Sequence, residues 1–133
     1  MGDAGGRAPD RDAPVPVAAV SDSPERTALK KSIDALVASA AALRERLRNY
    51  EISMDRIRRG LDEGQPAIDA SSGTSIPSDR RLVTESIEQF EQARHELRVA
   101  LIAAGRAEGS SVAEVAAVLG ISRQLAYRLT ARG

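Results

Sequence analysis

The sequence contains no cysteine, which excludes disulfide bonds, thiol catalysis and cysteine-ligated zinc. Aromatic residues make up only 2% of the chain, so little is available for stacking on single-stranded bases. His95 is the only histidine, and one imidazole provides neither a metal cluster nor a catalytic triad. No apolar run approaches the roughly 20 residues of a membrane-spanning helix, and the N-terminus lacks the order of a secretory signal. We therefore expect a cytoplasmic protein that is not an enzyme and has no cofactor and no metal ion.

Charges of the two signs balance, with 19 lysines and arginines against 19 aspartates and glutamates. Any contact with nucleic acid must therefore come from a local basic patch. Alanine and aliphatic residues supply nearly all of the 42% hydrophobic content, and this composition favours helices. Lys30 and Lys31 are the only lysines, and this preference for arginine, together with the alanine content, points to a GC-rich bacterial or phage genome.

The N-terminal part of the chain differs in composition from the rest. Residues 1–26 are rich in glycine, proline, aspartate and alanine and show no periodicity. Such a segment cannot bury enough apolar surface to offset its ordering entropy. We expect a disordered tail here.

A helical hairpin is predicted for residues 27–93. In its first helix, to about Leu61, apolar residues alternate steps of four and three, the period of a coiled-coil seam. Ser23 or Thr27 is a suitable cap, Pro24 suits a first helical position, and Gly60 and Gly64 indicate the end. The seam consists of Leu29, Ile33, Leu36, Ala40, Leu43, Leu47, Tyr50, Met54, Ile57 and Leu61.

Glycine, proline and serine recur through residues 64–78, so we expect a loop there, pinned by Ile68 and Ile76. A second helix is expected from Ser78 or Asp79 to about Gly105. Arg94 interrupts its stripe, and a charge in a seam can fix register or partner choice. The stripe consists of Val83, Ile87, Phe90, Leu97 and Leu101. The two helices predict an antiparallel hairpin, and two hairpins would make a four-helix bundle. Periodicity alone does not separate pairing within the chain from pairing between two copies.

The C-terminal segment contains a series of local helix signals. Residues 105–110 are expected to break the second helix. Ser111 and Glu114 have the spacing of a capping box, Gly120 suits a left-handed turn after a short helix of residues 112–119, and Ser122 is a good cap for a last helix over residues 123–131.

Apolar residues fall where two crossing helices would need them. Ala116, four residues before the turn glycine, is small enough for a close crossing. The small core is expected to comprise Val115, Leu119, Ile121, Ala126 and Leu129, closed by Leu97 and Leu101. These features predict a helix-turn-helix domain over residues 94–133. The expected fold class is thus all-α: a long antiparallel, coiled-coil-like hairpin followed by a C-terminal trihelical helix-turn-helix.

Residues 110–130, with the pattern "SVAEVAAVLGIS…YRL", resemble the helix-turn-helix of bacterial DNA-binding proteins. The pattern is most similar to the C-terminal domain of serine recombinases of the resolvase/invertase type. Sigma-factor region 4 is a looser likeness. The resemblance covers about a fifth to a third of the chain, and nothing upstream looks like the recombinase catalytic domain, so recombination is not implied. What it implies is binding of double-stranded DNA in the major groove by a small bacterial or phage transcriptional regulator associated with the nucleoid.

The second helix of such a motif enters the major groove by its N-terminal half. Arginine can pair with guanine and glutamine with adenine, while the amides around Ser110, Ser111 and Val112 would face a phosphate. The expected DNA-binding residues are Ser111, Ser122, Arg123, Gln124, Tyr127 and Arg128. Charge distribution agrees, because residues 94–133 are net positive by three and residues 65–93 net negative by three. Arg44, Arg46, Arg48, Arg56, Arg58 and Arg59 form a further basic cluster, interspersed with acids as on a solvated helix face.

A single small DNA-binding domain, which we call a reader, buries little surface on DNA. Two such readers commonly bind together and so bury enough surface for stable binding. We therefore expect a homodimer through the two long helices.

Two other functions are compatible with the sequence. One is a helical adaptor that binds another helical protein, for example in the transcription machinery, with purely structural terminal helices. An outward-facing Leu125 would suit such a contact. The other is a small helical enzyme of the chorismate-mutase kind, with Arg44 and Arg48 clamping a dicarboxylate, but most arginines fall off the apolar seam. A phage packaging or recombination accessory protein also stays open.

Overall fold

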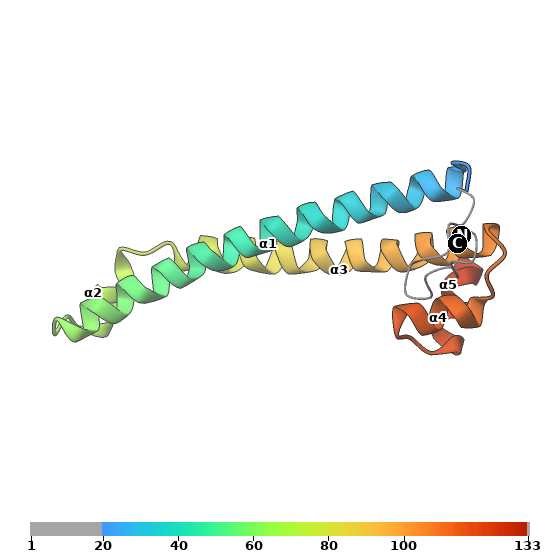
Figure 1. Cartoon of the computed structure of the whole chain (residues 1–133). Helices are drawn as coiled ribbons and strands as arrows, with labels where there is room; N and C mark the ends of the chain where they lie inside the picture. The colour runs from blue at the N-terminus through green and yellow to red at the C-terminus, as the bar shows by residue number, and fades with distance from the viewer. Residues whose placement is uncertain (1–19, 133) are drawn as a thin grey trace, which may run out of the picture.

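The computed structural model describes residues 20–132, and residues 1–19 of the predicted tail lie outside them. The described residues form five helices and no strand (Figure 1), which confirms the all-α prediction. The helices are α1 (Pro24–Asp62), α2 (Ala67–Ser72), α3 (Ile76–Ala107), α4 (Val112–Leu119) and α5 (Arg123–Arg132). None of these helices is both long and apolar enough to cross a membrane.

The two long helices α1 and α3 pack side by side in opposite directions (Figure 1). Near the start of α1, the Arg26 guanidinium donates to the Glu108 carboxylate just after α3, at 2.7 Å. Towards the other end, the Ser53 hydroxyl donates to the Asp79 carboxylate at 2.6 Å. At 1.5 Å per residue the helices are about 58 Å and 48 Å long. The predicted antiparallel hairpin is confirmed.

The first helix begins earlier than expected. The Ser23 side chain accepts a hydrogen bond from the Arg26 amide at 3.1 Å, and Pro24 occupies the first helical position. Both local signals were visible in the sequence, and together they stop the helix from fraying back to Thr27. Residues 24–26, which we assigned to the tail, are therefore helical.

The connection between the long helices is partly helical, so the prediction of a loop throughout residues 64–78 was wrong. Helix α2 folds back on α1 at Gly60, where an added Cβ would lie 3.0 Å from the Ala70 Cβ. Ile68 pins nothing, since it is 78% exposed. Helix α3 begins at Ile76 rather than Ser78, because Pro77 in the first turn needs no amide partner.

Small side chains form the buried contact between the long helices. The buried residues are Ser53 and Gly60 on α1 and Ser86, Ala93, Ala100 and Ala104 on α3, besides Ile102 on the other side of α3. Of the predicted α1 seam, Ile33, Leu47 and Leu61 stay more than 40% exposed. The hairpin thus closes on small residues beside the seam and leaves part of the apolar stripe uncovered.

Candidate nucleic-acid interface

The last turns of α3 form a compact unit with α4 and α5, and the predicted boundary at residue 94 falls inside the continuous helix α3. Its core consists of Ile102, Val112, Val115, Ala116, Ala126 and Leu129, flanked by Val99, Leu101, Leu119, Ile121 and Leu125. The sequence prediction named most of these residues. It chose Leu97 where the structure uses Ile102, because Leu97 belongs to the stripe facing α1. Ile102 lies five residues further on, about 140° round the helix.

Helix α4 approaches α3 closely at Gly105. A Cβ added there would lie 2.7 Å from Val115 Cγ2, so the missing side chain makes room for α4. We expected Gly105 to break the helix, and this was wrong, since α3 continues to Ala107. The chain turns instead at Gly109, whose φ of 94° is in the left-handed region.

The local signals for α4 and α5 are confirmed. The Glu114 amide donates to Ser111 Oγ at 3.1 Å, and that hydroxyl also lies 3.2 Å from the Glu114 carboxylate. Gly120 ends α4 with φ 70° and ψ 30°. The Leu125 amide donates to Ser122 Oγ at 3.1 Å, which caps α5. Gly120 and the Ser122 cap therefore fix how α5 leaves α4.

One face of α5 is left open to solvent. Arg123, Gln124, Tyr127 and Arg128 are all exposed, and their spacing of one, four and five residues places them together on the helix. Tyr127 is 58% exposed and packs little on its own unit. The opposite side carries the buried Ala126 and Leu129. The helix thus presents two guanidinium groups, an amide and a phenol on a surface that a hydrophobic core holds in place.

The two serines predicted to contact DNA are exposed but have local partners. Ser122 Oγ accepts from the Leu125 amide and keeps a hydroxyl hydrogen to donate. Ser111 is engaged with Glu114, whose carboxylate stands in the first turn of α4. A negative group at this position opposes a phosphate, so Ser111 is the less suitable of the two.

Leu125 does not point outward as we had expected. It is half-buried and packs against the core of the unit, so it offers no exposed protein contact. The exposed apolar residue of this unit is Val118 on α4, with 79% of its surface accessible. Little in the sequence indicated that Val118 is exposed, because a valine in a short apolar helix is usually expected to be buried.

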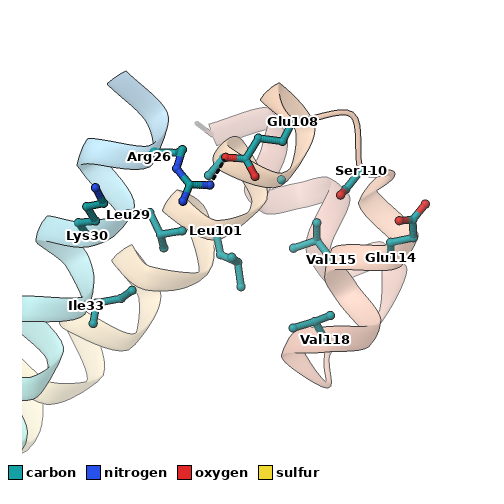
Figure 2. Close-up of a pocket in the computed structure, with 12 residues that line it drawn as sticks. Arg26, Leu29, Lys30, Ile33, Leu101, Glu108, Ser110, Glu114, Val115 and Val118 are labelled. Carbon is teal, nitrogen blue, oxygen red and sulfur yellow. Dashed lines mark hydrogen bonds and ion pairs between the residues drawn. The ribbon is translucent and has the colours of Figure 1, made fainter. Parts of the chain in front are cut away.

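Val118 borders a cavity of about 400 Å³ between α1, α3 and α4. In Figure 2, Leu29 and Ile33 of α1, Leu101 of α3, and Val115 and Val118 of α4 surround it. The Arg26–Glu108 ion pair lies at its upper end, and its hydrogen bond raises the pKa of Arg26 above the ordinary value. Lys30 reaches away to Asp22 and lowers the pKa of that carboxyl through a hydrogen bond. The cavity walls are mainly apolar.

Within residues 20–132, no group of three or more histidines, aspartates or glutamates is arranged to hold a metal ion. Comparison of the chain with protein families, with curated proteins and with solved structures finds no match. The residues of α5 and their geometry are therefore the basis for inferring a function.

Proposed function

We propose that the protein binds double-stranded DNA sequence-specifically, with residues 94–133 acting as a helix-turn-helix and α5 lying in the major groove. The observation that carries this proposal is the open face of α5. Arg123 and Gln124 stand in its first turn, where a recognition helix contacts base edges. The Ser122 cap and the left-handed Gly120 hold that turn in a fixed orientation.

The side chains on this face fit different parts of DNA. Arginine can donate two hydrogen bonds to the O6 and N7 atoms of guanine, and glutamine pairs with the N6 and N7 atoms of adenine. We assign these roles to Arg123 and Gln124. Tyr127 and Arg128 lie further along the face, and we assign them to the phosphate backbone, where contacts position the protein without reading sequence.

Charge supports contact at this end only. Residues 94–133 are net positive by three, whereas residues 65–93 are net negative by three. On the far part of the hairpin, Arg58 and Arg59 pair with Asp62 and Asp55, and Arg81 lies 4.0 Å from Glu85. A neutral protein can bind an anionic duplex when its positive charge is gathered at one end.

The size of the reader argues for two copies. A single small module buries about 600–1,000 Å² on DNA, and dimers place two modules on half-sites about 34 Å apart. We therefore propose a homodimer joined through the long helices and acting as a small bacterial or phage transcriptional regulator. Within it, residues 110–130 alone resemble the DNA-binding domain of serine recombinases of the resolvase/invertase type, without their catalytic domain.

The first test is a titration of the full-length protein into pools of labelled duplex DNA, followed by fluorescence anisotropy at several salt concentrations. For a protein that contacts several phosphates, the logarithm of the binding constant falls linearly with the logarithm of the salt concentration. Selection from the same pools should then enrich a repeated half-site. Absence of binding by the folded protein at low salt would contradict the proposal.

A further inference from the structure

One side of the hairpin carries an uncovered apolar strip, which we call the open flank. On α1 it consists of Ile33, Val37, Ala40 and Leu47, and on α3 of Ile87, Phe90 and Leu101. Ile33 and Leu101 line one cavity together. Ala40, Leu47 and Phe90 line a second groove, which Arg44, Arg48 and Glu51 also border. The contributions of α1 and α3 therefore lie on the same side of the hairpin.

Several large aliphatic side chains of the open flank stay substantially exposed. Ile33, Leu47 and Ile87 are 43–45% exposed and Val37 is 64% exposed. At the end nearest α4, Val118 extends the strip with another exposed valine (Figure 2). Contiguous apolar surface of this kind marks an interaction site, and a two-helix hairpin buries such a strip by packing on another pair of helices.

We propose that a second copy of this chain covers the open flank, with the two hairpins parallel and related by a two-fold axis along their length. In this arrangement α1 of each copy lies over α3 of the other. The C-terminal units of both copies then lie at the same end, where Leu101 and Val118 of one copy meet the start of α1 of the other.

Charged residues in and beside the flank select this orientation. The contacts Arg26–Glu108 and Ser53–Asp79 each join residues at the same level of two antiparallel helices. The two residue numbers have nearly the same sum in both pairs. This sum therefore identifies which other residues of α1 and α3 lie level with each other. By the same relation Arg44 lies level with residues near 89. In the parallel dimer, Arg44 therefore faces Glu91 of the second copy.

A second pair follows from the same relation. Glu51 lies level with residues near 82 and so faces Arg80 of the second copy. Arg44, Glu51 and Arg80 have no ion-pair partner within residues 20–132, whereas Glu91 already pairs with Arg94 of its own chain at 2.9 Å and would be shared with Arg44 of the second copy. Two-fold symmetry repeats both pairs, which gives four opposite-charge contacts across the interface.

The antiparallel alternative lays α1 against α1 of the second copy. It therefore does not bring Arg44 opposite Glu91 or Glu51 opposite Arg80 of that copy. It would also separate the two C-terminal units by the length of the hairpins, whereas the parallel mode keeps them together beside their α3 helices.

The orientation rests on the proposed function in one respect, because DNA binding requires both readers at the same end. The interface itself can be tested without DNA, and the absence of cysteine makes the test direct. Chains carrying Arg44→Cys are mixed with differently sized chains carrying Glu91→Cys and oxidised under mild conditions. Ile52→Cys replaces Arg44→Cys in the control. Residue 52 follows Leu47 by five positions and so lies about 140° away round the helix.

A parallel dimer predicts a covalent heterodimer from Arg44→Cys with Glu91→Cys and none with Ile52→Cys. Covalent homodimers of Arg44→Cys alone would overturn the orientation in favour of the antiparallel mode. A monomer at all concentrations in sedimentation would overturn the second copy as the occupant, and another helical protein would then have to cover the flank.

Two substitutions of similar exposure provide an independent check. Leu47 and Ile52 are 43% and 49% exposed on different sides of α1. Leu47→Glu should weaken dimerisation at least about tenfold, because both copies place the charge in the interface. Ile52→Glu should leave it unchanged. Equal dimer strength in the two variants would contradict the proposal, whereas failure of the wild-type dimer to bind DNA would contradict the proposed function alone.

Discussion

The methyl groups of Val115 on α4 occupy the space beside Gly105 on α3, where a Cβ atom would lie 2.7 Å from Val115 Cγ2. Valine is stiff about χ1 and cannot swing aside. We predict that Gly105→Ala lowers the free energy of unfolding by about 1–2 kcal/mol, because crowding outweighs the ~1 kcal/mol gain in helix propensity. Urea denaturation followed by circular dichroism measures this. The double variant Gly105→Ala with Val115→Ala should lose less stability than the sum of the two single variants. A Gly105→Ala variant more stable than the wild-type protein would contradict the close contact.

Gly120 is required for its backbone conformation and not for space. Its φ is 70°, yet nothing lies within 4 Å of an added Cβ. Gly120→Ala should therefore lower the free energy of unfolding by about 1 kcal/mol through backbone strain alone. Gly120→Asn should cost less, because asparagine tolerates the left-handed region. Equal stability of the wild-type protein and the alanine variant would show that the turn does not need this conformation.

The Ser122 cap connects stability with the proposed DNA contact. Ser122→Ala should cost about 1 kcal/mol of stability. It should also weaken DNA binding, because Arg123 and Gln124 stand in the turn that the cap organises. Ser122→Thr keeps an oxygen acceptor and should restore most of both. Ser78→Ala, at an exposed position in the first turn of α3, is the control and should change neither.

The apolar pattern of the sequence would place Leu125 on the surface and Val118 in the core, and the structure shows the reverse. Leu125 is half-buried against the core, whereas Val118 is 79% exposed. We expect Leu125→Ser to lower the melting temperature, at a cost of about 2 kcal/mol. Val118→Ser should stay within about 0.5 kcal/mol of the wild-type protein at protein concentrations too low for dimerisation. If the ranking were reversed, α5 would be rotated relative to the core.

Local signals in the sequence were sufficient to predict helices α4 and α5 of the C-terminal unit. The Ser111–Glu114 and Ser122 caps and the left-handed Gly120 act within four residues, so their spacing alone predicted α4 and α5. Gly105 was misassigned and Ile102 was missed, because their roles depend on where α4 packs on α3. The place where α4 contacts α3 is set by tertiary packing and not by residues adjacent in the sequence.

For the hairpin, the sequence predicted the helices but not the residues that pack between them. Period and composition predicted two long helices, but the buried contact uses Ser53, Ser86 and small residues such as Ala93. A pattern based on hydrophobicity selects leucine and isoleucine, whereas closely packed helices favour small side chains at the contact. The large apolar residues lie beside it, and this is why α1 looked like one seam but has a covered side and an open flank.

The assignment of α5 as the DNA-reading helix is tested by comparing two double variants in DNA binding. Arg123→Ala with Gln124→Ala removes the proposed base contacts, while Arg81→Ala with Gln89→Ala removes the same residue types from exposed positions on α3 far from α5. Anisotropy at one salt concentration, on the duplex selected by the wild-type protein, gives both affinities. We predict a loss of at least about tenfold for the first variant, since each good base contact contributes about 1–3 kcal/mol, and little change for the second. Equal affinity of the two variants, with both folded, would contradict the assignment of α5 as the DNA-reading helix.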